Sequence, residues 1–212
     1  MSFTVLISFI IYSFVTSVTP GPNNIMLAAS GVNFGFRRSI PHILGIGIGF
    51  GFMVSVVGLG IGSLISSNIV LYELLKIIGI TYLLYLAYKI YHSSSVDTTS
   101  GKSKPLTFLQ AAMFQWVNPK AWIMAMGAVT TYLSSQSELY WYVIIGVIYG
   151  AIRIPSTGVW ALIGEKLQKY IHEPKKLKTF NMVMALLLVL SVIQPLIDFL
   201  FFVVAFASEL SL

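Results

Sequence analysis

Two proline-containing segments interrupt long apolar stretches of this chain, Thr19-Pro20-Gly21-Pro22-Asn23-Asn24 and Phe114-Gln115-Trp116-Val117-Asn118-Pro119-Lys120. Proline lacks the N–H group that a helix interior needs and clashes with the preceding turn, while glycine adds backbone freedom. A regular helix therefore cannot continue through Pro20-Gly21-Pro22. The second segment predicts the start of a new half-helix, because Asn is a good N-cap and Pro suits the first helical position. At the first segment, Thr19 is the predicted cap.

The composition of the chain places these breaks inside a lipid bilayer. Of its 212 residues, 57% are hydrophobic and only 9% are charged, whereas soluble domains carry about 25% charged residues. So few charges cannot cover a surface that faces water, which makes the bilayer the expected surroundings. The chain has no cysteine, so disulfides and thiolate metal sites are excluded. We expect neither a metal site nor a cofactor.

Six apolar stretches are long enough to cross a membrane, for which about 20 residues suffice. They cover roughly residues 3–32, 39–66, 69–91, 107–134, 139–163 and 180–206. The predicted fold is therefore an all-α integral membrane protein with a single transmembrane domain, residues 1–212. It comprises one repeat at 1–92, a Ser/Thr-rich cytoplasmic linker at 93–106 and a second repeat at 107–212. Since each half has an odd number of spans, the two repeats would be inverted, with spans one and four broken near the midplane.

The positive residues indicate which way the chain faces. The short loops on one side of the membrane carry none. The positive residues gather at the connections on the other side, at Arg37, Arg38, Lys89, Lys102, Lys104, Lys166, Lys169, Lys175, Lys176 and Lys178. Positive residues stay in the cytoplasm, so both termini are predicted to lie outside. This sidedness also accounts for the net charge of +6, and no nucleic-acid partner is expected.

The two breaks predict that the substrate binds at the midplane, between the broken first and fourth spans. A half-helix N-terminus presents unpaired N–H groups and about half a positive charge, which suits an anionic group such as an amino-acid carboxylate. Amides and one cation flank the breaks, and Arg153 lies mid-membrane, where charged residues are expensive and usually functional. The predicted substrate-binding set is Pro20, Gly21, Pro22, Asn23, Asn24, Gln115, Asn118, Pro119, Lys120 and Arg153. The alternatives are structural kinks at the breaks and, for Arg153, a structural ion pair with Asp198 or a water-filled cavity.

On these motifs the chain resembles the LysE/RhtB family of amino-acid exporters. The matching residues are Thr19 to Asn24, Gly35-Phe36-Arg37-Arg38 with Gly45 and Gly49, Gly79-x-x-Tyr82-Leu83, Phe114 to Lys120, and Asn181 to Leu190. The sequence around these motifs is most similar to that of the branch associated with cysteine and O-acetylserine export. The resemblance implies secondary active export of small amino acids or derivatives across the bacterial inner membrane. The energy would come from an ion gradient, as in proton antiport, without ATP.

The resemblance also bears on coupling. Many relatives carry Asp directly after the Pro-Gly-Pro motif, where this chain has Asn23. A carboxylate that could carry a proton is therefore missing there, and the remaining coupling candidates are Asp198 and Glu73. Glu73 also lies three residues before Lys76, a spacing that predicts an ion pair on one helix face.

Two other functions are open from the residues alone. A passive channel would share the membrane fold, and an intramembrane hydrolase would use Ser30, Ser55 and His42, although no nucleophile motif surrounds them. No catalytic residue is assigned. A homodimer is possible, since the glycine-rich stretch at 39–66 has the spacing for close helix packing within or between protomers.

Overall fold

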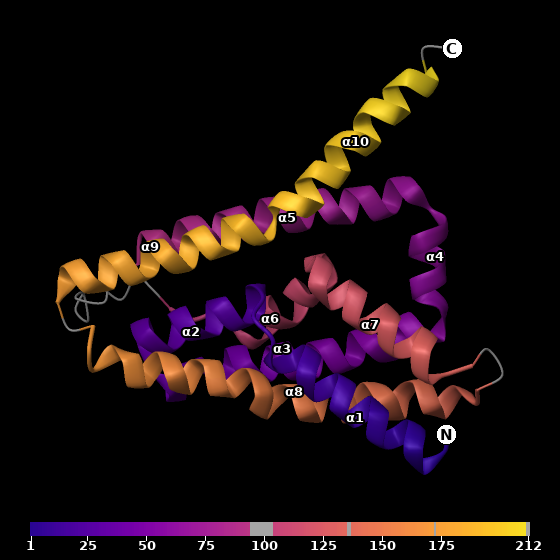
Figure 1. Cartoon of the computed structure of the whole chain (residues 1–212), viewed down its shortest axis with the longest axis horizontal. Helices are drawn as coiled ribbons and strands as arrows, with labels where there is room; N and C mark the ends of the chain where they lie inside the picture. The colour runs from indigo at the N-terminus through magenta and orange to yellow at the C-terminus, as the bar shows by residue number, and fades with distance from the viewer. Residues whose placement is uncertain (94–103, 135–136, 172, 211–212) are drawn as a thin grey trace.

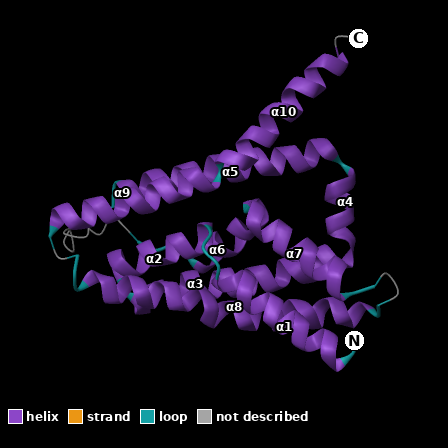
Figure 2. Cartoon of the chain, in the orientation of Figure 1, coloured by secondary structure: helices purple, strands orange, loops and turns teal. Residues whose placement is uncertain are grey.

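The computed structural model describes residues 1–93, 104–134, 137–171 and 173–210, and all regular structure in these ranges is helical (Figure 2). Most of the predicted linker at 93–106, together with Lys102, lies outside the described residues. The elements are α1 (Phe3–Val18), α2 (Pro22–Phe34), α3 (Phe36–Val56), η1 (Val57–Ile61), α4 (Gly62–Ser67), α5 (Ile69–Tyr91), α6 (Phe108–Phe114), η2 (Gln115–Val117), α7 (Pro119–Tyr132), α8 (Leu139–Gln168), α9 (Pro174–Ser191) and α10 (Ile193–Leu210).

Fewer helices than predicted are long enough to cross a membrane. Among the described residues, four helices are long and apolar enough, and a fifth is added if α1 and α2, which meet at a 54° bend, form one span. The predicted fourth span at 107–134 is divided into α6, η2 and α7, each too short to cross alone. The described residues thus give four or five candidate spans where six were predicted, because the predicted breaks in spans one and four shorten the helices on either side of them.

The helices form two layers with the second break between them (Figure 1). In one layer, α3 lies along α8, and α1 and α2 also pack on α8. In the other, α5 lies along α9, and α10 projects beyond the rest of the molecule. Helix α6 packs on α3, and η2 contacts α5, so the α6–α7 segment joins the two layers.

Glycines allow the closest approach in the first layer. A Cβ atom on Gly150 of α8 would lie 2.9 Å from the carbonyl oxygen of Gly47 in α3. Only glycine permits such an approach between helix backbones. The glycine-rich face of α3 therefore packs within the protomer, the first of the two arrangements, within or between protomers, that the sequence left open. The homodimer itself stays a prediction.

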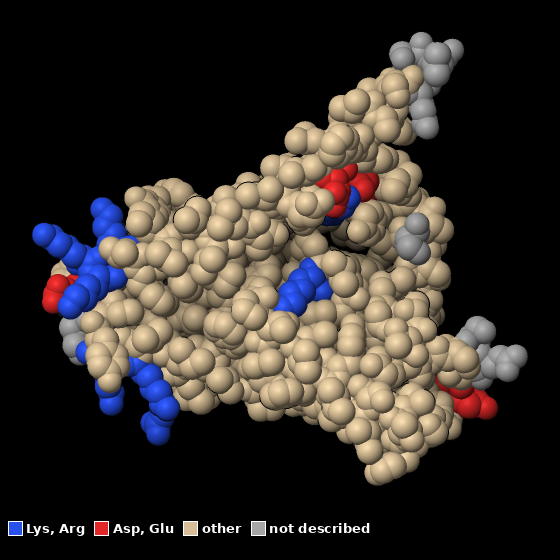
Figure 3. All heavy atoms as spheres, viewed as in Figure 1, with Lys and Arg blue, Asp and Glu red and all other residues tan. Residues whose placement is uncertain are grey.

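Charge is distributed unevenly along the molecule. Figure 3 shows the Lys and Arg side chains gathered mainly at one end, near the junctions of α2 with α3 and of α8 with α9. Both chain termini lie toward the other end (Figure 1). The apolar flanks between these ends are the surface that lipid would cover.

Candidate functional site

The first break is held open by donors from other parts of the fold. Helix α1 ends at Val18, and the chain runs extended through Pro20 and Gly21 before α2 begins. The carbonyls that the break frees are all bonded. Asn24 Nδ2 donates to the carbonyls of Ser17 (2.9 Å) and Thr19 (2.8 Å). Trp160 Nε1 donates to the carbonyl of Val18 (3.1 Å). At membrane depth such partners are required, because no water replaces them.

The predicted capping role of Thr19 is wrong. The N-cap position of α2 is Gly21, and no side chain in the described part of the chain caps this helix. Thr19 instead ends α1, and its hydroxyl donates to the carbonyl of Thr16 (2.9 Å). The extended Pro20 and Gly21 put Thr19 two residues too early for the cap. The N-terminus of α2 is therefore free of any side-chain cap.

The second break follows the sequence more closely. Helix α6 tightens into η2, and Asn118 then adopts an extended conformation before Pro119 starts α7. The Asn118 Oδ1 atom accepts from the backbone N–H of Lys120 (3.1 Å), which confirms Asn118 as the N-cap. Because its own Asn occupies this helix start, α7 offers an anion less than α2 does.

Side chains from the two breaks bond directly to each other. Asn23 and Gln115 form a reciprocal amide pair, with Asn23 Nδ2 donating to Gln115 Oε1 (2.9 Å) and Gln115 Nε2 to Asn23 Oδ1 (3.3 Å). Both residues are buried. The Lys120 ammonium donates to the carbonyls of Thr19 (2.8 Å) and Pro20 (3.0 Å) and to the Thr19 hydroxyl (3.0 Å). A cation from the second break thus caps the negative end of α1 at the first.

Arg153 is buried at the same place without an acidic partner in the described part of the chain. It is 3% exposed, lies over the Phe50 ring at 4.1 Å from the centroid, and points Nη1 at the sulfur of Met124 (3.7 Å). Its Nε atom has no hydrogen-bond partner among the residues described. The proposed pair with Asp198 is not formed, because Asp198 accepts from Gln194 Nε2 instead (2.8 Å).

A small cavity collects most of the predicted binding residues. It has a volume of about 10 Å³ and is lined by Thr16, Ser17, Gly21, Pro22, Asn23, Asn24, Asn118, Lys120 and Arg153. This is room for about one water molecule. An amino acid does not fit there in this conformation. Gln115 and Pro20 contribute through their bonds to Asn23 and Lys120 rather than as lining residues.

A larger cavity lies on the other side of Lys120, between α5, α7 and the junction of α9 with α10. It measures about 330 Å³, and its lining includes Pro119, Lys120, Lys76, Gln194 and Asp198. Its size falls in the range of about 300–1,000 Å³ that is usual for small-molecule sites. Lys120 lines both cavities and therefore separates them.

The two coupling candidates differ in their setting. Asp198 lines the larger cavity and is exposed to it. Glu73 is buried and forms the predicted ion pair with Lys76. Its second carboxylate oxygen has no partner among the described residues. Lys76 lines the larger cavity, whereas Glu73 is not among the described residues that line it.

Sequence reasoning missed a third break. Helix α9 ends at Ser191 and α10 starts at Ile193, within the stretch predicted as one continuous sixth span. Ser191, Gln194 and Pro195 line the larger cavity. The Gln194-Pro195 pair was the available signal, since it places an amide beside a proline inside an apolar stretch, as Asn118-Pro119 does.

These features define a multi-pass helical membrane protein whose helices are broken around a polar interior. A family model for the LysE type translocator matches residues 14–197, and the chain belongs to this family. It is 33% identical over 187 residues to the cysteine/O-acetylserine efflux protein of Salmonella typhimurium, covering 87% of this chain and 93% of that one. It is 32% identical over 191 residues to the protein of the same name from Escherichia coli K12, covering 89% and 96%.

No solved structure matches the chain. Family membership makes the protein a transporter and not an enzyme. Among the described residues, those considered for an intramembrane hydrolase form no serine–histidine hydrogen bond. Ser30 bonds to Ser39 (2.8 Å), Ser55 donates to the carbonyl of Gly51 (3.2 Å), and neither ring nitrogen of His42 has a partner among the described residues.

Proposed function

We propose that this chain exports a small amino acid or a close derivative by alternating access, with the substrate bound in the larger cavity against Lys120. The observation that carries the proposal is the placement of opposite charges around that cavity. Lys120 lines one part and Asp198 another. The third charged residue of the lining, Lys76, is already paired with Glu73, and most of the other lining residues are apolar. An amino-acid zwitterion carries the complementary pair of charges.

The substrate carboxylate is assigned to Lys120, with Arg153 behind it. Two cations at the small cavity have no acidic partner among the described residues. Arg153 is buried, and a buried charge without an acidic partner is costly, so it would attract an incoming carboxylate strongly. Lys120 is only partly buried and would exchange its carbonyl acceptors for the carboxylate. The uncapped N-terminus of α2 adds favourable N–H groups beside them. The side chain of the substrate remains small on this proposal, consistent with cysteine or O-acetylserine, the substrates in the relatives' names.

Lys120 also offers a mechanism for conformational change. In this structure its ammonium is bonded to the end of α1 at the first break. If Lys120 turns to a substrate in the larger cavity, the carbonyls of Thr19 and Pro20 lose this donor. The angle between α1 and α2 would then be free to change. Substrate binding and movement of the first broken helix are thereby linked through one side chain.

Asp198 is proposed as the coupling group. A substrate ammonium and a proton would compete for the same carboxylate, so each would leave as the other arrives. Such competition produces antiport of substrate against protons. Glu73, which is already paired with Lys76, is the second candidate.

The six-span inverted repeat remains our proposal for the architecture. Equivalent parts of the two halves pack together, α3 with α8 and α5 with α9. The first elements of each half, α1–α2 and α6–α7, meet through the Asn23–Gln115 pair. The gathering of basic residues at one end supports a cytoplasmic location of that end and an outer location of both termini in the bacterial inner membrane.

Uptake of radiolabelled O-acetylserine and cysteine into proteoliposomes under an imposed pH gradient tests this function. We expect accumulation that collapses when the gradient is dissipated, and a loss of at least tenfold in Lys120→Met. Lys166→Met, which removes an exposed lysine of α8, is the matched control and should transport normally. Flux that does not depend on the pH gradient would favour a passive channel. Normal flux in Lys120→Met would refute the assigned binding site.

A further inference from the structure

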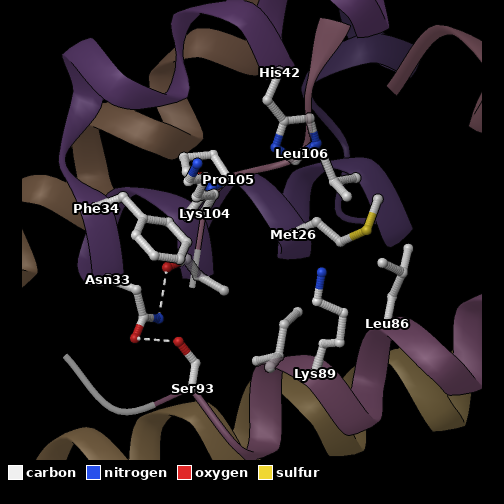
Figure 4. A pocket seen from close by; sticks show the side chains of 13 residues that line it. Met26, Asn33, Phe34, His42, Leu86, Lys89, Ser93, Lys104, Pro105 and Leu106 are labelled. Atoms are coloured by element: carbon white, nitrogen blue, oxygen red, sulfur yellow. Dashed lines mark hydrogen bonds between the residues drawn. The ribbon is translucent and has the colours of Figure 1, made fainter. Parts of the chain in front are cut away.

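A third cavity lies near the basic end of the molecule, away from the breaks. It has a volume of about 70 Å³ and lies between α2, α3, α5 and the chain just before α6 (Figure 4). One buried water needs about 10–15 Å³ by this measure, so the space holds roughly five waters or a small group such as a carboxylate. Its polar lining includes Ser30, Asn33, His42, Lys89 and Lys104.

His42 is the unusual member of this lining. The residue is 1% exposed, and both its Nδ1 and Nε2 atoms lack a hydrogen-bond partner in the described part of the chain. Buried polar side chains are almost always bonded, and a neutral imidazole has one donor and one acceptor to place. In Figure 4 the His42 ring and the Lys89 ammonium point toward each other from opposite walls. The unused imidazole therefore faces a space that a ligand can occupy.

The other charged groups give this space a positive character. Lys89 and Lys104 both line it, and no described residue pairs with either of them as an acid. The Asn33 amide is already committed, since its Nδ2 donates to Ala29 and Asn181 and its Oδ1 accepts from Ser93. The groups that lack both a hydrogen bond and an acidic partner among the described residues are thus the imidazole and the two ammonium ions, of which Lys89 also lies over the Tyr85 ring at 5.8 Å from the centroid. This set recognises a small anion that also forms hydrogen bonds.

Helix α2 connects this cavity to the first break. Asn24 at the start of the helix lines the small midplane cavity, and Ser30 lines the one near the basic end. Six residues of α-helix span about 9 Å. A molecule in the basic-end cavity would therefore be less than two helical turns from the breaks, on the side from which export begins if the basic end is cytoplasmic.

We propose that this cavity is an entry site that binds the carboxylate of the exported amino acid before it reaches the breaks. His42 donates one hydrogen bond to the carboxylate, and Lys89 and Lys104 supply the attraction. This inference rests on the proposed function and adds a second substrate-binding site to it. A phosphate group, free or from a lipid headgroup, shares the anionic chemistry, and the experiment separates it from a carboxylate.

The test is a titration of the purified full-length protein in phosphatidylcholine nanodiscs, followed by nuclear magnetic resonance of ¹⁵N-labelled histidine rings. O-acetylserine should shift the His42 resonances saturably, and its methyl ester, which has no carboxylate, should not. The ring of His92, which bonds the carbonyl of Tyr88 at 2.9 Å, serves as the internal reference. His42→Gln assigns the resonance by removing it. Lys89→Met with Lys104→Met should raise the half-saturation concentration at least tenfold, and Lys166→Met should leave it unchanged.

Several results would overturn the entry site. They are an unchanged His42 resonance, an equal response to the methyl ester, an unaltered half-saturation in the double lysine variant, or a stronger response to inorganic phosphate or phosphatidylglycerol than to O-acetylserine. The proposed function is judged separately by flux in proteoliposomes. Flux without a His42 response refutes the entry site alone, whereas a protein that transports no amino acid under any gradient refutes the proposed function.

Discussion

The amide pair between the two breaks gives the sharpest prediction about this fold. Asn23 and Gln115 are 92 residues apart in the sequence, are 4% and 0% exposed, and exchange two hydrogen bonds. We expect Asn23→Leu and Gln115→Met each to destabilise the protein. The expected result for the double variant is a loss smaller than the sum of the two single losses, because each substitution alone strands the other amide.

The magnitude follows from the geometry. Hydrogen bonds between side chains of membrane helices contribute about 0.6 kcal/mol on average and at most about 1.7 kcal/mol. Two bonds, one of 2.9 Å and a weaker one of 3.3 Å, predict a coupling free energy of about 1 kcal/mol. Gln115 Nε2 also donates to the carbonyl of Ala111 (2.8 Å). The loss of this bond adds to the destabilisation by Gln115→Met, but it occurs in the double variant too and so cancels in the coupling free energy.

Unfolding of the four proteins by dodecyl sulfate in mixed micelles, followed by circular dichroism, measures this coupling. The matched control is the second amide pair, Asn33 with Asn181, whose bonds measure 2.9 and 3.2 Å. It should show a similar coupling free energy. We expect substitution of Asn23 or Gln115 also to reduce transport of O-acetylserine at least tenfold. The Asn33–Asn181 pair is a control for the coupling free energy alone, because Asn33 lines the proposed entry site. A coupling within about 0.3 kcal/mol of zero would show that the two breaks are not joined through these amides.

Four further predictions concern single positions. Lys120→Met should lower the free energy of unfolding by about 1–3 kcal/mol, since three acceptors lose a charged donor. Lys120→Arg should restore part of the lost stability. An unchanged denaturation midpoint in Lys120→Met would contradict the capping of α1 by Lys120. Arg153→Met should raise the same free energy by about 1–3 kcal/mol, because a buried unpaired cation is removed, while flux is lost; a variant that is both less stable and active would reverse that assignment. Asp198→Asn should still bind O-acetylserine but exchange it independently of the pH gradient, and retained gradient-driven accumulation would shift the coupling role to Glu73. Gly79→Ala should cost about 1–3 kcal/mol in unfolding experiments, because its Cβ would press on the carbonyl of Val117. The control Gly158→Ala would meet no described atom closer than 3.9 Å and should be neutral. Equal effects of the two substitutions would argue against the close approach of α5 to the second break.

The chemistry of the breaks follows from the sequence alone. Pro-Gly-Pro and Asn-Pro interrupt helices through steric clash and a missing N–H, and these effects act within a few residues of the chain. The Asn118 cap and the Glu73–Lys76 pair are equally local, and both are present. Thr19 failed as a cap although it too is local. The backbone stays extended for two more residues, and that conformation depends on the donors that hold the end of α1.

Composition, charge and these short motifs by themselves determined that the chain is a helical membrane protein with polar breaks, and they were enough to indicate its family. Only the tertiary structure decided that Asn23 pairs with Gln115, that Lys120 caps α1 and divides two cavities, and that Asp198 faces the larger cavity rather than Arg153. Apolar stretches in lipid specify that helices form. Because the surface of such a helix is apolar all round, its sequence does not indicate which face packs against a neighbouring helix. The partner of a buried polar group is therefore set by the rotation and depth at which helices pack, and these depend on close contacts between residues far apart in the sequence.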